Sequence, residues 1–78
     1  MVKNIVVYGK QDCIYCSKAK SYLDDLDLPF QYIDITYWSK ELKDGLKSRY
    51  NMKSVPIIVI DGKLIGGYTE LTQQLHLV

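Results

Sequence analysis

The sequence predicts an α/β domain whose four-stranded mixed sheet is flanked by three helices, in the order βαβαββα. Three observations support this fold class. Short runs of β-branched and aromatic residues alternate with stretches of helical periodicity. The first two runs are joined through a helix, so their strands should be parallel with a right-handed crossover. The last two runs are separated by Asp61-Gly62, a hairpin turn signal, so their strands should be antiparallel.

The first strand and the first helix follow from the opening third of the chain. Residues 3–8 are apolar with almost no polar interruption, which is typical of a strand buried on both faces, and Gly9 should end it. A helix is expected from Cys13 to about Leu26, because apolar residues recur there at helical spacing and Pro29 requires that the helix has already ended.

The middle of the chain predicts a second strand and an amphipathic helix. Residues 30–35 alternate and are rich in β-formers, which favours a strand. Ser39 is the expected N-cap of the helix, and Gly45 in its interior costs about 1 kcal/mol relative to Ala. Charged residues, among them Lys43 and Lys47, are assigned to its other faces. One face carries apolar residues at steps of four: Trp38, Leu42, Leu46 and Tyr50.

The last third of the chain predicts a hairpin and a short helix. Residues 57–60 form the third strand and residues 63–65 return as the fourth. The final helix should run from Thr69 to about His76. Its sheet-facing residues are expected to be Leu71 and Leu75.

Composition limits the classes of function. The chain has 78 residues, is 47% apolar and carries a formal net charge of +1, which predicts one domain over residues 1–78 and favours a monomer. That charge gives no electrostatic footprint for nucleic acid or an anionic membrane. The longest apolar run, residues 55–60, is far below the ~20 residues of a spanning helix, and the first run is too short for a signal-peptide core. We therefore expect a cytoplasmic protein.

Cys13 and Cys16 are the two cysteines of the chain, and their spacing points to chemistry. A bridge that closes so short a loop removes little unfolded-chain entropy, so a stabilising role is not the obvious one. At the start of a helix, unpaired N–H groups and the helix dipole stabilise a thiolate and lower a cysteine pKa from ~8.5 to between ~3.5 and ~7.5. Cys13 is therefore the expected nucleophile, and Cys16, about one turn in, the resolving thiol. Lys10 adds positive charge to this loop and Asp12 opposes it.

Two other interpretations of the cysteines are weaker. They could be small buried hydrophobes on a helix, as free cysteines often are. They could also form half of a zinc site, but four ligands are required and only His76 remains as a strong candidate, so no metal is expected. The redox interpretation is favoured because a C-x-x-C pair beside a βαβ pattern is the context in which such chemistry occurs.

Three segments together resemble a known family. They are Cys13-Ile14-Tyr15-Cys16, Ser54-Val55-Pro56 and Gly66-Gly67-Tyr68-Thr69-Glu70, in the order and spacing of glutaredoxins. The resemblance covers essentially the whole chain. It implies a thioredoxin-like fold with glutathione as the reducing co-substrate.

The resemblance also implies a role for each matching residue. Cys13 attacks the disulfide and Cys16 resolves it. The backbone of Val55, held before a cis Pro56, pairs with the cysteine portion of glutathione, and Lys10 meets a carboxylate. The other binding residues line the groove or receive the γ-glutamyl end: Tyr15, Ser54, Gly67, Tyr68, Thr69 and Glu70.

Elementary chemistry agrees with two of these roles. Free backbone groups beside the proline can hold an extended peptide as an added strand. Gly66-Gly67 before a helix leaves N–H groups for a carboxylate, and the charge of Glu70 suits an ammonium group.

The sequence departs from the family pattern at three positions: Ile14 stands where Pro is common, Ser54 where Thr is, and Glu70 where Asp is. The leading hypothesis is a glutathione-dependent oxidoreductase that reduces protein disulfides and glutathione mixed disulfides, with ribonucleotide reductase among its candidate targets. One alternative is a redoxin that is reduced by thioredoxin reductase and feeds ribonucleotide reductase, although that type generally carries Gln in place of Tyr15. Another is a dimer that binds a bridging iron–sulfur cluster. A plain interaction domain would leave both thiols unused.

Overall fold

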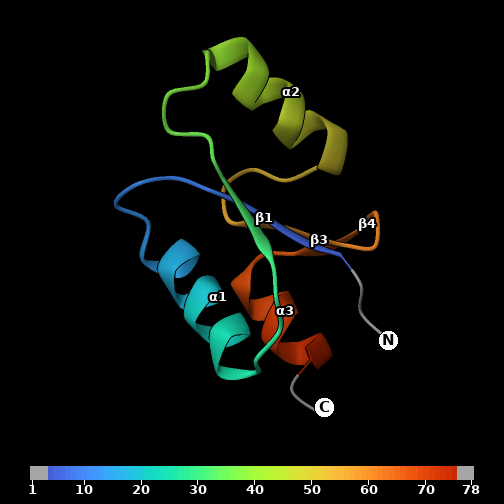
Figure 1. The fold of residues 1–78 in the computed structure, drawn as a ribbon. Coiled ribbons are helices and arrows are strands. Elements are labelled where there is room, and N and C mark those ends of the chain that lie inside the picture. The colour runs from blue at the N-terminus through green and yellow to red at the C-terminus, as the bar shows by residue number, and fades with distance from the viewer. Residues whose placement is uncertain (1–3, 76–78) are drawn as a thin grey trace.

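The computed structural model describes residues 4–75, with only the backbone of Leu75, and it contains the predicted elements in the predicted order (Figure 1). The expected end of the last helix at His76 and the expected orientation of Leu75 lie outside the described residues. Within residues 4–75, no helix is long and apolar enough to cross a membrane. The elements are β1 (Ile5–Gly9), α1 (Ile14–Asp25), β2 (Gln31–Asp34), α2 (Lys40–Tyr50), β3 (Ile57–Ile60), β4 (Lys63–Gly66) and α3 (Tyr68–Leu75).

The sheet is mixed, in the order β2-β1-β3-β4, which confirms the predicted fold class. β1 is parallel to β2, whereas β1 with β3 and β3 with β4 are antiparallel. β1 runs one residue further than predicted, because Gly9 pairs with Asp34 instead of ending the strand. The ring of Tyr32 lies over this glycine, and a Cβ there would stand 2.8 Å from Tyr32 Cζ. Gly9 therefore provides space within the strand.

Helices cover both faces of the sheet, with α1 and α3 on one side and α2 on the other (Figure 1). This explains why every residue of β3 is buried. The core under α1 and α3 consists of Ile5, Val7, Ala19, Leu23, Ile58, Ile60 and Leu71. The core under α2 consists of Ile35, Leu46, Ile57 and Val59.

The inward face of α2 differs from the prediction. Ser39 caps the helix as expected, with its Oγ accepting the Leu42 N–H at 3.2 Å, but Leu42 itself is 60% exposed. Steps of four residues drift by about 40° around a helix of 3.6 residues per turn, and Leu42 falls outside the sheet-facing side. The other three residues of the predicted stripe belong to the core under α2 or pack against it: Trp38, Leu46 and Tyr50. Lys43 and Lys47, assigned to the outer faces, are half-buried instead.

α3 begins at Tyr68, one residue before the predicted start. The N–H of Gly67, which precedes the helix, donates to Glu70 Oε1 at 2.7 Å. This is the backbone half of a capping box, in which the third helical residue satisfies an N–H that the helix leaves unpaired. Thr69, the expected first residue of the helix, is its second residue.

Candidate active site

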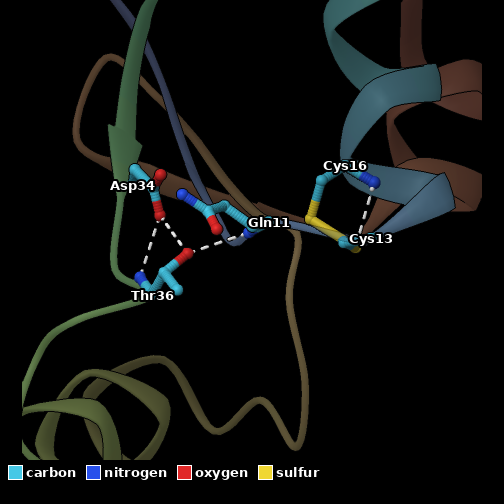
Figure 2. Close-up of a disulfide and its surroundings, with 5 residues drawn as sticks. All are labelled: Gln11, Cys13, Cys16, Asp34 and Thr36. Atoms are coloured by element: carbon cyan, nitrogen blue, oxygen red, sulfur yellow. Dashed lines mark hydrogen bonds between the residues drawn. A yellow bond between two sulfur atoms is a disulfide. The ribbon is translucent and has the colours of Figure 1, made fainter.

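The two cysteines are bonded to each other at the start of α1 (Figure 2). Cys13 is the N-cap, with extended backbone, and its Sγ accepts the Cys16 N–H at 3.2 Å, as an oxygen does at an ordinary N-cap. The two Cα atoms lie 5.2 Å apart, within the range that a disulfide requires. Because the helix N-terminus and this N–H both favour negative charge, a thiolate released at Cys13 is stabilised where it forms.

Exposure separates the two thiols as expected for a nucleophile and a resolving group. Cys16 is 1% exposed and belongs to the core, whereas Cys13 is only half-buried. Cys13 opens on a shallow hollow that Asp12, Ile14 and Ser17 also line. A disulfide partner can therefore reach Cys13 and not Cys16.

A groove of about 260 Å³ is lined by Tyr15, which lies between the two cysteines in the chain. It is bounded by the first turn of α1, the segment before β3 and the start of α3, which the sheet topology brings together. The rings of Tyr15 and Tyr68 lie 6.0 Å apart, and the Val55–Pro56 peptide bond is cis. The lining residues are Tyr15, Met52, Ser54, Val55, Pro56, Gly67, Tyr68, Thr69 and Glu70.

Every residue that the sequence assigned to glutathione binding lines this groove except Lys10. Met52 is an addition that sequence reasoning missed. Its only signal is its position two residues before Ser54, in the segment that leads to the proline.

Lys10 lines a second cavity, of about 130 Å³, which it shares with Ile35, Lys43 and Lys47. Ser54 and Val55 border this cavity as well as the groove, so the two are neighbours. Sequence reasoning missed Lys43 and Lys47 because it placed them on the outer faces of α2. Their spacing of four residues, which puts two side chains on one side of a helix, was the available signal.

The loop between β1 and Cys13 is tied to the end of β2 (Figure 2). The Gln11 N–H donates to Thr36 Oγ1 at 2.8 Å, while the Thr36 hydroxyl and N–H both donate to Asp34 Oδ1. These two hydrogen bonds from Thr36 hold the pKa of the Asp34 carboxyl below its ordinary value, and the bond from the Thr36 hydroxyl has the larger effect. Desolvation opposes them by a smaller amount, and the charge of Lys20 lowers the pKa slightly further. Sequence reasoning missed this tether, because it joins residues 25 apart that carry no motif.

The α3 end of the groove is organised differently from the expectation that Gly66-Gly67 offers free N–H groups. The Gly67 N–H is already taken by Glu70. Gly66 has a φ of +127°, and a Cβ there would stand 2.8 Å from Glu70 Cγ, so this position requires glycine for its backbone and for space. This end of the groove therefore presents a carboxylate whose position the backbone fixes.

The described residues hold no metal site: among residues 4–75, no group of His, Cys, Asp and Glu side chains is placed to hold an ion. His76, which the zinc interpretation required, lies outside these residues.

Residues 5–65 match the glutaredoxin family model. N-acetyl-S-hydroxy-L-cysteine reductase of Bacillus subtilis is 41% identical over 90% of this chain and 75% of its own length. Human mitochondrial glutaredoxin-2 is 30% identical over 92% of this chain, which spans only 44% of that protein.

Solved structures agree in fold. A buckwheat glutaredoxin–glutathione complex has a TM-score of 0.81 at 28% identity, over 92% of this chain and 67% of that one. Glutaredoxin 1 from Francisella tularensis, complexed with cacodylate, has a TM-score of 0.80 at 25% identity, over 95% and 93%. With its Cys13–Cys16 pair at a helix start, the chain belongs to the glutaredoxin family of thiol–disulfide oxidoreductases.

Proposed function

We propose that this protein is a glutathione-dependent oxidoreductase that reduces protein disulfides and glutathione mixed disulfides. The observation that carries the proposal is the groove in which Tyr15, from the segment between the two cysteines, converges with Val55 and Glu70. The fold similarity to a glutaredoxin solved with glutathione supports it.

The placement of glutathione follows from the charges. Its cysteine pairs with the backbone of Val55, which puts the sulfur beside Cys13. Its ammonium group meets the Glu70 carboxylate, and its glycine carboxylate enters the cavity of Lys10. The groove thus orients a molecule that is positive at one end and negative at the other.

The reaction is a sequence of thiolate attacks on disulfides. The Cys13 thiolate attacks one sulfur of the substrate, the substrate S–S bond breaks, and the departing thiolate takes a proton from solvent. The Cys16 thiolate then attacks Cys13 in the mixed disulfide, which forms the bond seen in the structure and releases the reduced substrate. Two glutathione molecules reduce that bond, and they leave as glutathione disulfide.

The decisive assay supplies NADPH either through glutathione and glutathione reductase or through thioredoxin reductase, with a glutathione mixed disulfide and a protein disulfide as substrates. Turnover through glutathione supports the proposal, and turnover through thioredoxin reductase alone would favour the ribonucleotide-reductase donor type. Cys13→Ser should abolish both reactions. Cys16→Ser should retain removal of glutathione from mixed disulfides and lose reduction of protein disulfides.

A second candidate function is favoured by the similarity to N-acetyl-S-hydroxy-L-cysteine reductase. Cys13 would attack the sulfur of a small cysteine sulfenic acid, form a mixed disulfide and release hydroxide, which is protonated to water. Cys16 would then release the free thiol. Because an N-acetyl group has no positive charge, Glu70→Gln should raise KM for glutathione mixed disulfides and leave KM for the acetylated substrate unchanged.

A further inference from the structure

Within residues 4–75, the cavity of Lys10, Lys43 and Lys47 is lined by three positive charges and by no acidic side chain. Lys43 and Lys47 are half-buried and lie one turn apart on α2, and Lys10 faces the same space from the active-site loop. Among the residues described, none of these three ammonium groups is in an ion pair. Two half-buried lysines and the exposed Lys10 give the cavity a positive potential, which favours an anion.

The cavity has room for a carboxylate and the carbon atoms that carry it. Its volume of about 130 Å³ is well above the ~10–15 Å³ that a single water requires. It is also less open than the groove, and its wall includes the apolar side chain of Ile35. A carboxylate inside it would be partly removed from solvent, where charge pairs are stronger than on an open surface.

The position of the cavity indicates which kind of molecule would supply the carboxylate. Ser54 and Val55 line the cavity and the groove, so a chain bound in the groove against Val55 lies next to the cavity. At the other end of the groove stands the Glu70 carboxylate, which repels acidic groups. An extended peptide whose cysteine lies against Val55 is thus oriented by charge, with its acidic side toward the lysines.

We propose that the cavity formed by Lys10, Lys43 and Lys47 binds an acidic side chain of the protein substrate, one that follows the reacting cysteine in the substrate sequence. The proposal rests on the proposed function, because it places the substrate cysteine at Val55 in the orientation assigned to glutathione. It adds a rule of substrate choice: disulfides whose cysteine is followed by Asp or Glu are reduced in preference to others.

The test uses peptides in which one cysteine is bonded to 2-mercaptoethanol, a small neutral thiol that makes no charged contact. In one peptide the cysteine is followed by Asp-Glu, in a second by Ser-Gln, and in a third it is preceded by Asp-Glu. The first should react with a kcat/KM roughly tenfold above the second, because complementary charges accelerate association. The third should show no gain, and the advantage of the first should fall as salt is added.

A matched pair of variants assigns the effect. In Lys43→Gln/Lys47→Gln the ratio of the first to the second peptide should fall to about 1. Lys40→Gln/Lys63→Gln removes the same charge from exposed positions outside both cavities and should keep the ratio. Circular dichroism checks that both variants fold.

The outcomes separate this inference from the proposed function. Equal rates on all three peptides, or a preference for the peptide with preceding acidic residues, would overturn the acidic-residue rule while glutathione-dependent turnover stands. An advantage that survives in Lys43→Gln/Lys47→Gln would also overturn it. If the native protein shows no glutathione-dependent turnover at all, both the acidic-residue rule and the proposed function are contradicted.

Discussion

The α3 end of the groove and the neighbouring lysine cavity under α2, called the α2 end, carry opposite charges and differ in whether the protein itself pairs them. At the α3 end, the Glu70 carboxylate is satisfied within the protein, because it accepts the Gly67 N–H at 2.7 Å. At the α2 end, Lys10, Lys43 and Lys47 gather without an ion-pair partner among residues 4–75. The Glu70 carboxylate is therefore held in place by the protein before a ligand binds, whereas the three lysines would gain an ion-pair partner only from a bound anion. Changes at the α3 end should mainly affect stability, and changes at the α2 end should mainly affect binding.

Gly66→Ala should reduce stability more than any other change considered, because it disturbs the α3 end of the groove, where the backbone and Glu70 are tightly packed. The new Cβ would stand 2.8 Å from Glu70 Cγ at a φ of +127°, which side chains rarely adopt. We expect a loss of about 1–3 kcal/mol from the backbone alone, measured by urea denaturation.

Gly67→Ala is the matched control for that substitution, since its Cβ would meet Glu70 Oε1 at 3.3 Å without a positive φ. Its loss should be smaller. The double change Gly66→Ala/Glu70→Ala removes the contact with Glu70 Cγ but keeps the contact with its Cβ, at 2.9 Å, and loses the bond from the Gly67 N–H, so it should recover little of the stability. A double variant much more stable than Gly66→Ala would show that the Glu70 side chain beyond Cβ, and not the backbone, sets the requirement for glycine.

Glu70→Ala should cost roughly 1 kcal/mol of stability, the usual value of an N-terminal cap. It should also raise KM for glutathione mixed disulfides, because the partner of the ammonium group is gone. Glu70→Gln separates the two effects, since the amide oxygen can still accept the Gly67 N–H while the charge is lost. If both variants lose the same stability, the Gly67 bond is not the stabilising contact.

The active-site loop is also held by hydrogen bonds within the protein, from Gln11 to Thr36 and from Thr36 to Asp34. Thr36→Val should leave the Gln11 N–H without its partner. A loss of about 1 kcal/mol is expected. Thr36→Ser keeps the hydroxyl and should recover most of it. Thermal denaturation of both variants measures the difference.

Asp34 also gives the tether a pH dependence with a defined sign. Its folded pKa lies below the ordinary 3.8, so its contribution is fully present above that value and is lost as pH falls through the folded pKa. Asp34→Asn should flatten that acid limb of the stability curve. An unchanged acid limb would show that the carboxylate does not control the loop.

The sequence was sufficient for the fold because each element carries a local signal. The β-branched runs, Ser39 and the Asp61-Gly62 turn all depend on neighbours in the chain, and the structure confirms the elements they predict. The cysteine pair is equally local, since a helix start is visible in the sequence and its effect on a thiol follows from the unpaired N–H groups.

What the sequence did not yield depends on long-range placement. Thr36 meets Gln11 only because β1 and β2 pair in a particular register, and periodicity does not fix the rotation of α2 closely enough to turn Lys43 inward and Leu42 outward. The bond from Gly67 to Glu70 was missed for another reason. The glycines were considered as donors to a ligand, although a glutamate three residues later is a known partner of such an N–H.

The smallest effect on stability is expected at the cavity of Lys10, Lys43 and Lys47, whose charges have no ion-pair partner among residues 4–75. Lys43→Gln/Lys47→Gln should leave stability unchanged or raise it by a few tenths of a kcal/mol, because like charges four residues apart destabilise a helix. At the same time KM for glutathione mixed disulfides should rise, and its dependence on salt should weaken, as two charges that attract the ligand are removed. Denaturation and steady-state kinetics on one preparation measure both. A clear loss of stability would mean that these lysines are satisfied by the protein itself, and the contrast between the two ends of the groove would disappear.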